Sequence, residues 1–180
     1  MWKLLIQEQI HVINEKGRVM KTFKRYLCKC DDTWMACAYE AEKGCIGVEY
    51  GSERNQIFHY VFKGSAKVGK IFDGNPKTID GSKGKLIDCK DLYAVDTVFE
   101  FLEDTEMWGF NVLDGNVNWD AKIVTESKLT ITKKSALVCL GGTPTVNSKE
   151  LIKYDYVDIA SGDYTIDLKT DGILVLFTKT

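Results

Sequence analysis

Histidine, proline and arginine are scarce in this chain of 180 residues. It contains two histidines, His11 and His59, two prolines, and three arginines among 24 basic residues. Imidazole is the commonest metal ligand in proteins and the side chain best suited to proton transfer near neutral pH. Two histidines leave little room for either chemistry, and the shortage of proline argues against a rigid linker between domains.

The chain has no excess of positive charge. Its 24 lysine and arginine residues face 26 acidic ones, which gives a formal net charge of −2. Binding to a nucleic-acid backbone or to an anionic membrane surface depends on clustered positive charge. We therefore expect neither nucleic acid nor membrane among the partners of this protein.

Long hydrophobic runs are also missing. Residues 1–9 lack the basic segment and long apolar core of a signal peptide. The most apolar stretch, Gly172–Phe177, has the length of a strand and falls far short of the roughly 20 residues of a membrane span. These features predict a soluble, cytoplasmic protein, or a virion component if the role is structural.

Six cysteines are present, and their spacing does not favour a metal site. A structural zinc site needs two closely spaced ligand pairs, whereas only Cys28 and Cys30 lie close enough together to form one. In a chain without a leader, the cysteines are expected to be reduced thiols that pack as small hydrophobic side chains. We expect no metal and no cofactor.

Glycine and short β-forming segments are abundant. Fifteen glycines accompany Asn and Asp clusters such as Asp73–Pro76 and Ser161–Asp163, which are typical of tight turns. The segments between them are rich in β-branched and aromatic residues and predict an all-β sandwich or barrel. The predicted strands are residues 18–28, 34–41, 45–50, 56–63, 66–72, 92–102, 107–113, 119–125, 128–132, 135–140, 154–158, 164–168 and 172–178.

Residues 33–42 allow two interpretations. Asp32 and Thr33 could cap a helix that ends at Gly44. As a strand, residues 34–41 would instead present mostly apolar side chains on both faces, as in a strand buried inside a sandwich. The sequence leaves both interpretations open.

A faint internal repeat suggests two similar β-rich halves. Residues 61–68 match residues 138–146, with Gly64 in the place of Gly141, and each match is followed by a polar loop and a segment that ends in aspartate, at Asp88 and Asp158. We predict a first half at residues 1–103 and a second half at residues 104–180, fused into one compact unit.

The order of strand, glycine, strand, polar turn and strand resembles the cupin jelly roll, a double-stranded β-helix. Within that superfamily the chain resembles the HutD/Ves family of bicupins. The matching stretches are Trp34–Glu40 with Gly44, Tyr50–Arg54, Gly64, Gly109–Leu113 and Trp119–Ala121. The resemblance implies two fused cupin-like sandwich halves and a role in small-molecule binding or regulation.

Several positions depart from the family pattern. Met35 stands where the family often has arginine, Gly109 where it has aspartate, and residues 113–116 where it has methionine followed by basic residues. Part of the polar lining of the family's pocket is therefore lost.

The resemblance also bears on metals, because metal-dependent cupins generally hold their ion with three histidines and a glutamate. His59 occupies a plausible inward position in its strand, but no second histidine neighbours it. A metal-dependent dioxygenase or isomerase is therefore not expected. A histidine hydrogen-bonded within the structure is the alternative role for His59.

Five residues are candidates for binding a small ligand. Arg54 follows Glu53 in the turn that matches the family's polar motif, and its guanidinium could hold a small carboxylate or form a structural ion pair with Glu53 or Asp120. His59 would lie in the same pocket. Asn111 and Trp119 could add an amide and an aromatic wall, or serve only the core and turns.

No catalytic motif accompanies these residues. The chain has no G-x-S-x-G, P-loop or G-x-G-x-x-G pattern, and no two acids stand out as a catalytic pair. We therefore predict a metal-free, cupin-like binding or regulatory protein, without an assigned enzymatic activity. The alternative is a structural or interaction protein, such as a phage virion or assembly component, that forms oligomers and has a degenerate pocket.

Overall fold

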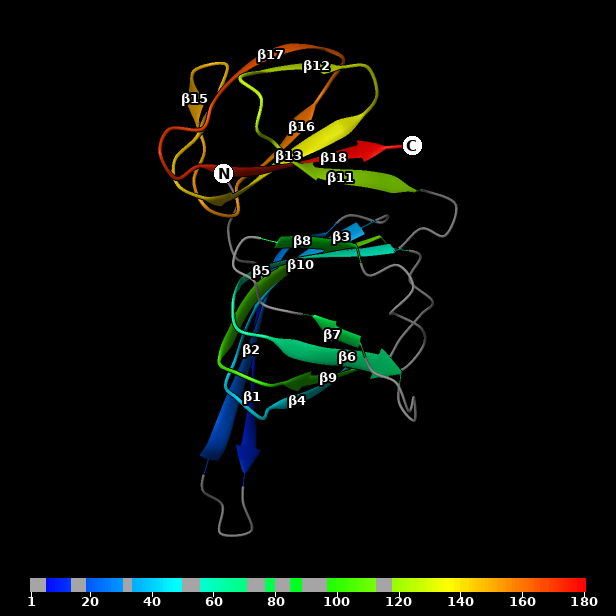
Figure 1. The fold of residues 1–180 in the computed structure, drawn as a ribbon, viewed down its shortest axis with the longest axis vertical. Helices are drawn as coiled ribbons and strands as arrows, with labels where there is room; N and C mark the ends of the chain where they lie inside the picture. Colours follow the sequence, from blue (N-terminus) through cyan, green and yellow to red (C-terminus); the bar gives the residue numbers. More distant parts are fainter. Residues whose placement is uncertain are drawn as a thin grey trace. The chain divides into compact units, whose positions relative to one another are not determined.

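A computed structural model of the chain describes residues 6–13, 19–30, 34–49, 56–70, 77–79, 85–88, 97–112 and 118–180. The described residues form β-strands and connecting loops (Figure 1), and they contain no helix that could cross a membrane. The all-β prediction is confirmed. The strands divide into two compact units, residues 4–116 and residues 117–180.

The first unit contains ten described strands in two antiparallel sheets. Its strands are β1 (Ile6–Ile13), β2 (Val19–Cys30), β3 (Trp34–Ala41), β4 (Ile46–Glu49), β5 (Gln56–Lys63), β6 (Ala66–Lys70), β7 (Lys77–Ile79), β8 (Lys85–Asp88), β9 (Thr97–Phe101) and β10 (Thr105–Val112). The six-stranded sheet has the order β1-β2-β3-β10-β5-β8, and the four-stranded sheet has the order β4-β9-β6-β7.

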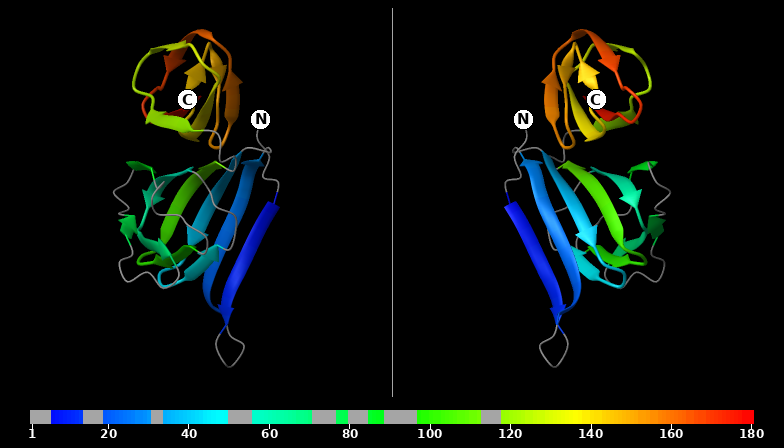
Figure 2. Two further views of the ribbon diagram at one scale, coloured as in Figure 1. Left: turned by 90° about the vertical axis from the view of Figure 1, so that its right-hand side faces the viewer. Right: turned by 90° about the vertical axis from the view of Figure 1, so that its left-hand side faces the viewer.

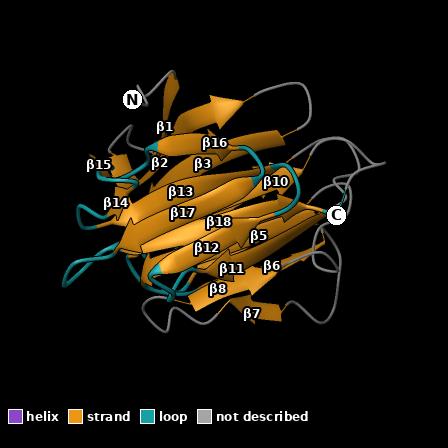
Figure 3. Ribbon diagram, turned by 90° about the horizontal axis from the view of Figure 1, so that it is seen from above, coloured by secondary structure: helices purple, strands orange, loops and turns teal. Residues whose placement is uncertain are grey.

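The second unit contains eight described strands in two four-stranded sheets. Its strands are β11 (Trp119–Ile123), β12 (Lys128–Ile131), β13 (Ser135–Gly141), β14 (Thr145–Val146), β15 (Lys149–Glu150), β16 (Tyr156–Ile159), β17 (Gly162–Asp167) and β18 (Ile173–Lys179). The sheet orders are β11-β18-β13-β16 and β12-β17-β14-β15. Figure 3 draws the chain coloured by secondary structure, with strands in orange.

The two units repeat one strand topology. Strands β3-β10-β5-β8 of the first unit correspond to β11-β18-β13-β16 of the second, and β4-β9-β6-β7 correspond to β12-β17-β14-β15. Only β1 and β2 of the first unit have no counterpart among the described strands of the second. The sequence pattern predicts a boundary after residue 103, whereas β10 pairs with β3 and β5 inside the first unit.

Residues 34–41 form a strand, so the strand interpretation is confirmed. β3 pairs with β2 on one side and with β10 on the other, which satisfies its backbone in the middle of the sheet. Six of its eight residues are buried, and only Met35 and Glu40 keep appreciable exposure. Both faces of the strand are therefore apolar, as expected for a strand buried on two sides.

Five strands were not expected from the sequence: β1, β7, β8, β14 and β15. β1 has Gln and Glu between its apolar residues, and the other four strands contain only two to four residues each. Such segments carry no alternating apolar pattern long enough to recognise. Pairing with neighbouring strands defines them.

A glycine with positive φ ends the central strand of each unit. Gly64 (φ 85°) follows β5, and Gly142 (φ 63°) follows β13. A Cβ on Gly64 would overlap Thr105 at the start of β10, and a Cβ on Gly142 would lie 2.6 Å from the backbone of Asp171 and Gly172 before β18. Gly64 thus corresponds to Gly142, one residue beyond the Gly141 that the sequence repeat had matched.

We expect Gly142→Ala to destabilise the second unit by about 2 kcal/mol or more, because alanine is strained at this φ and its Cβ meets backbone atoms. Gly141→Ala is the matched control: its φ is not positive, and its Cβ would meet mainly the flexible end of Ile173. It should cost less than about 1 kcal/mol. Urea unfolding measures the free energy of unfolding of both variants. Equal losses would contradict the interpretation that the positive φ and close backbone at position 142 require glycine.

The interior of the second unit is an apolar cluster drawn from both of its sheets. Its buried members are Val124, Leu129, Ile131, Leu137, Cys139, Val146, Leu151, Ile159, Ile166, Leu174 and Leu176. Cys139 has no exposed surface, and its Sγ donates a hydrogen bond to the Gly141 carbonyl at 3.4 Å. Burial, with a smaller effect of Asp155, raises the pKa of the Cys139 thiol from 9.0 to about 11.

This raised pKa makes stability depend on pH in the alkaline range. The thiol of the unfolded chain ionises from about pH 9 upward, whereas the folded chain keeps its proton until about pH 11. The free energy of unfolding should therefore fall as pH rises through this interval. Cys139→Val should show a smaller fall in urea unfolding between pH 8.5 and pH 11, and an unchanged slope would argue against a buried, protonated thiol.

Candidate functional site

The second unit shows which face of each large sheet points inward. In β13, Leu137 and Cys139 belong to the interior cluster, and in β18 so do Leu174 and Leu176. Leu137 pairs with Leu176 and Cys139 with Leu174, before a register shift near Gly141. Alternate residues of these strands therefore face the interior.

The first unit has a register shift at the corresponding place, so its residues can be matched one by one with those of the second unit. In β10 and β5, Met107 pairs with Val61 before the shift, and Gly109 pairs with His59. The pair of His59 and Gly109 thus corresponds to the pair of Leu137 and Leu176. This correspondence places His59 on the face of the large sheet that points to the interior of the first unit.

Contacts at the end of the sheet support the same orientation. Thr105, on the same face of β10 as Gly109, is buried, and its Oγ1 donates hydrogen bonds to the carbonyls of Ser65 (3.2 Å) and Glu103 (2.9 Å) in the connections to the smaller sheet. The opposite face at this end carries charge. There Lys63 and Glu106 form an ion pair at 3.2 Å, and both are well exposed.

His59 and Gly109 form the centre of the candidate site. His59 is 2% exposed. A Cβ placed on Gly109 would lie 3.0 Å from Cε1 and 3.1 Å from Nδ1 of His59, and 3.5 Å from Cε2 of Tyr39. The imidazole therefore lies over the glycine, beside the tyrosine ring, in space that a side chain at position 109 would fill.

Tyr39 also has an apolar counterpart in the second unit. Tyr39 pairs with Met107, which corresponds to Leu174, and the Val124 amide donates a hydrogen bond to the Leu174 carbonyl. Tyr39 thus corresponds to Val124. At three equivalent interior positions the first unit has histidine, glycine and tyrosine, whereas the second unit has leucine, leucine and valine.

The structure does not bring the five residues predicted to bind a ligand together in one described site. Glu53 and Arg54 lie outside the described residues, so their roles stay predictions. Asn111 lies two residues beyond Gly109 in β10, where it pairs with Met35 and Ile57. Trp119 is buried in β11 of the second unit and so belongs to a different unit from His59.

The sequence did not indicate Tyr39 as a neighbour of His59, and it placed Gly109 in a matching stretch as a departure from the family pattern, without a role in the site. Strand pairing also places one arginine of the chain, Arg25 in β2, opposite Tyr39. The signal that could have found these residues is the register of three adjacent strands. That register joins segments about 20 and 50 residues from His59 and cannot be obtained from local periodicity.

The residues present do not fit the ligand set of a metal-dependent cupin. That set needs three histidines and a glutamate, and the whole chain contains two histidines. His59 pairs with Gly109 and Ile87, neither of which can ligate a metal through its side chain. Among the residues that the structure describes, no three His, Cys, Asp or Glu side chains gather in a way that could hold an ion.

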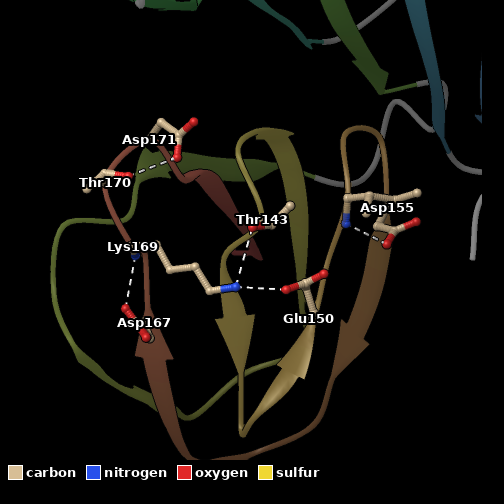
Figure 4. Close-up of polar contacts among 8 residues, drawn as sticks. Thr143, Glu150, Asp155, Asp167, Lys169, Thr170 and Asp171 are labelled. Atoms are coloured by element: carbon tan, nitrogen blue, oxygen red, sulfur yellow. Dashed lines mark hydrogen bonds and ion pairs between the residues drawn. The ribbon is translucent and has the colours of Figure 1, made fainter.

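A hollow of about 170 Å³ on the second unit is a less suitable site. Its lining includes Glu150, Asp155 and Tyr156. Each already bonds within the chain: Lys169 contacts Glu150 at 2.7 Å, the Ile152 amide donates to Asp155 at 2.8 Å (Figure 4), and the Tyr156 hydroxyl donates to Asp158 at 2.8 Å. These contacts support a structural role for the polar groups of the hollow.

Comparison with known proteins identifies the fold. No protein-family model matches the chain, and no curated protein matches it. HutD from Pseudomonas fluorescens is similar in structure, with a TM-score of 0.62 at 8% identity over 97% of this chain and 100% of that chain. A cupin 2 conserved barrel domain protein from Leptotrichia buccalis gives a TM-score of 0.56 at 9% identity, over 96% of each chain.

Oxalate decarboxylase from Bacillus subtilis is a third similar structure. Its TM-score is 0.56 at 9% identity, over 88% of this chain and 72% of that chain. The chain therefore has a cupin fold, and the resemblance to HutD expected from the sequence is confirmed at the level of the fold. At these identities the likeness concerns the fold alone.

The correspondence between the units predicts opposite effects for reciprocal substitutions. His59→Leu replaces a buried imidazole by its counterpart of similar volume and should change the free energy of unfolding by less than about 1.5 kcal/mol. Leu137→His places an imidazole in a fully apolar interior and should cost about 3 kcal/mol or more. Urea unfolding tests the pair. If His59→Leu costs as much as Leu137→His, His59 serves the stability of the core.

Proposed function

We propose that this cupin-fold chain is a small-molecule binding or regulatory protein that works without a metal, and that its site lies inside the first unit around His59. The observation that carries the proposal is the contrast between the two interiors. Where the second unit is filled with aliphatic side chains, the first has His59, Gly109 and Tyr39. We assign binding to the first unit and a structural role to the second.

The chemistry of these residues suits a small polar ligand. Imidazole can donate from one ring nitrogen and accept at the other, and the Tyr39 hydroxyl can do both. Buried polar groups are costly to the fold unless they are hydrogen-bonded, so proteins retain them in interiors mainly where they serve a purpose. Gly109 lets the imidazole lie close to the backbone of β10, because a Cβ at this position would be only 3.0 Å from Cε1 of His59.

We further propose a small carboxylate as the ligand class. An arginine beside the site would grip a carboxylate with two parallel hydrogen bonds. Arg54, in the turn that resembles the family's polar motif, is the first candidate, and Arg25, which pairs in register with Tyr39, is the second. Arg18 is the remaining arginine of the chain and serves as a control.

A thermal-shift panel of small carboxylates, sugars and nucleotides tests the proposal. A ligand that binds only the folded chain adds about 2.7 kcal/mol of stability at a concentration a hundred times its Kd, so the Tm rises. We expect small carboxylates to raise the Tm. Gly109→Ala, whose Cβ pushes against the His59 ring, should abolish the rise, and Gly141→Ala should preserve it.

Arginine variants identify the group that grips the carboxylate. Arg54→Ala or Arg25→Ala should weaken the thermal shift at least tenfold in ligand concentration, whereas Arg18→Ala should not. Stoichiometric zinc or iron in the purified protein would contradict the metal-free part of the proposal. If no compound shifts the melting temperature, binding fails, and the alternative role as a structural or interaction protein gains support.

A further inference from the structure

Strand β1 forms one edge of the six-stranded sheet in the first unit. It pairs along its whole length with β2, and it pairs with no other described strand. Figure 2 shows β1, coloured dark blue, at the rim of this sheet. A strand at an edge presents a row of backbone N–H and C=O groups that can pair with another strand.

β1 differs from the other edge strands of the described sheets in its length. β1 has eight residues, whereas the edge strands β8, β4, β12 and β16 have four each. The remaining edge strands, β7, β11 and β15, have three, five and two residues. Short edge strands discourage pairing with other chains, so β1 is the edge best able to pair.

β1 also lacks the residues that usually protect an edge. Lysine and proline on an edge strand oppose pairing, and residues 6–13 contain no lysine, arginine or proline. The edge strands β7, β8, β11, β12 and β15 all contain lysine. Glu8 is the single carboxylate of β1.

The internal repeat shows that this edge is an addition to the common fold. In the second unit the described sheet ends at β11, the counterpart of β3. In the first unit β2 pairs with β3 on the side that is an edge in the second unit, and β1 pairs with β2 and forms the new edge. The two added strands thus replace a short edge by a long, weakly charged one.

We propose that β1 is a dimerisation edge, and that its partner is β1 of a second copy of this chain, paired antiparallel about a two-fold axis near Gln9. This pairing sets Ile6 opposite Val12 and Gln7 opposite His11, each twice. Glu8 lies opposite Ile10, so no two like charges meet. The two six-stranded sheets become one continuous sheet across the dimer.

Two arguments favour a second copy as the occupant over an unrelated protein. In this register β1 brings no like charges together, and it pairs apolar Ile6 with Val12 and polar Gln7 with His11. In addition, pairing about a two-fold axis covers the β1 edge of both copies at once, so assembly stops at the dimer. Because a single strand pair is a small interface, the dimer should dissociate on dilution.

Sedimentation velocity of the full chain, from the low to the high micromolar range, tests the proposal. We expect a shift with concentration from the 20.4 kDa monomer to a dimer of twice that mass. Gln9→Lys sets two ammonium groups near each other at the axis and should weaken dimerisation at least tenfold, with partial recovery at high salt, because salt screens their repulsion.

Thr130→Lys is the matched control. Thr130 is an exposed residue in the middle of β12, an edge strand of the second unit, and its substitution should leave the dimer unchanged. Circular dichroism verifies that both variants are folded. A wild-type chain that stays monomeric at all concentrations, or a Gln9→Lys variant that dimerises as well as the wild type, would overturn the proposal.

Discussion

Burial of the central strands on both faces is the constraint on which this structure depends. Six consecutive residues of β13 are buried, and in β10 both Trp108 and Met107 are 1% exposed although they point to opposite faces. Because neither face meets water, the sequence loses the alternation of apolar and polar residues that marks a one-sided sheet. A polar residue in such a strand, as His59 is in β5, carries a cost of burial that its surroundings must offset.

The same constraint explains how much could be predicted. Apolar strands bounded by glycine and aspartate were recognisable, as was the two-faced burial of residues 34–41, and the family resemblance led to the cupin fold. The sequence also suggested an inward position for His59, but the neighbours of His59 in the interior could not be predicted. The sequence repeat matched Gly64 with Gly141, whereas the corner geometry matches it with Gly142. An error of one residue exchanges the two faces of a strand, so it would have given His59 the wrong counterpart.

The duplication supplies an internal comparison that a single domain lacks. Two copies of one eight-strand topology share a register shift and a glycine corner, so differences between their interiors do not arise from differences in fold. The replacement of an aliphatic pair by His59 and Gly109 is then a local change of chemistry on a common frame. Gly109 stands where the family that the sequence resembles has aspartate, and a side chain at this position would meet the imidazole.

The first and last strands of each eight-strand repeat are neighbours in the same sheet. Trp34 at the start of β3 pairs with Val112 at the end of β10, and Trp119 at the start of β11 pairs with Lys179 at the end of β18. Each repeat therefore closes on itself, with its two ends one strand spacing apart. A gene segment that encodes such a repeat can be copied in tandem or circularly permuted without stretching the chain, which gives a physical route from one cupin repeat to the two found here.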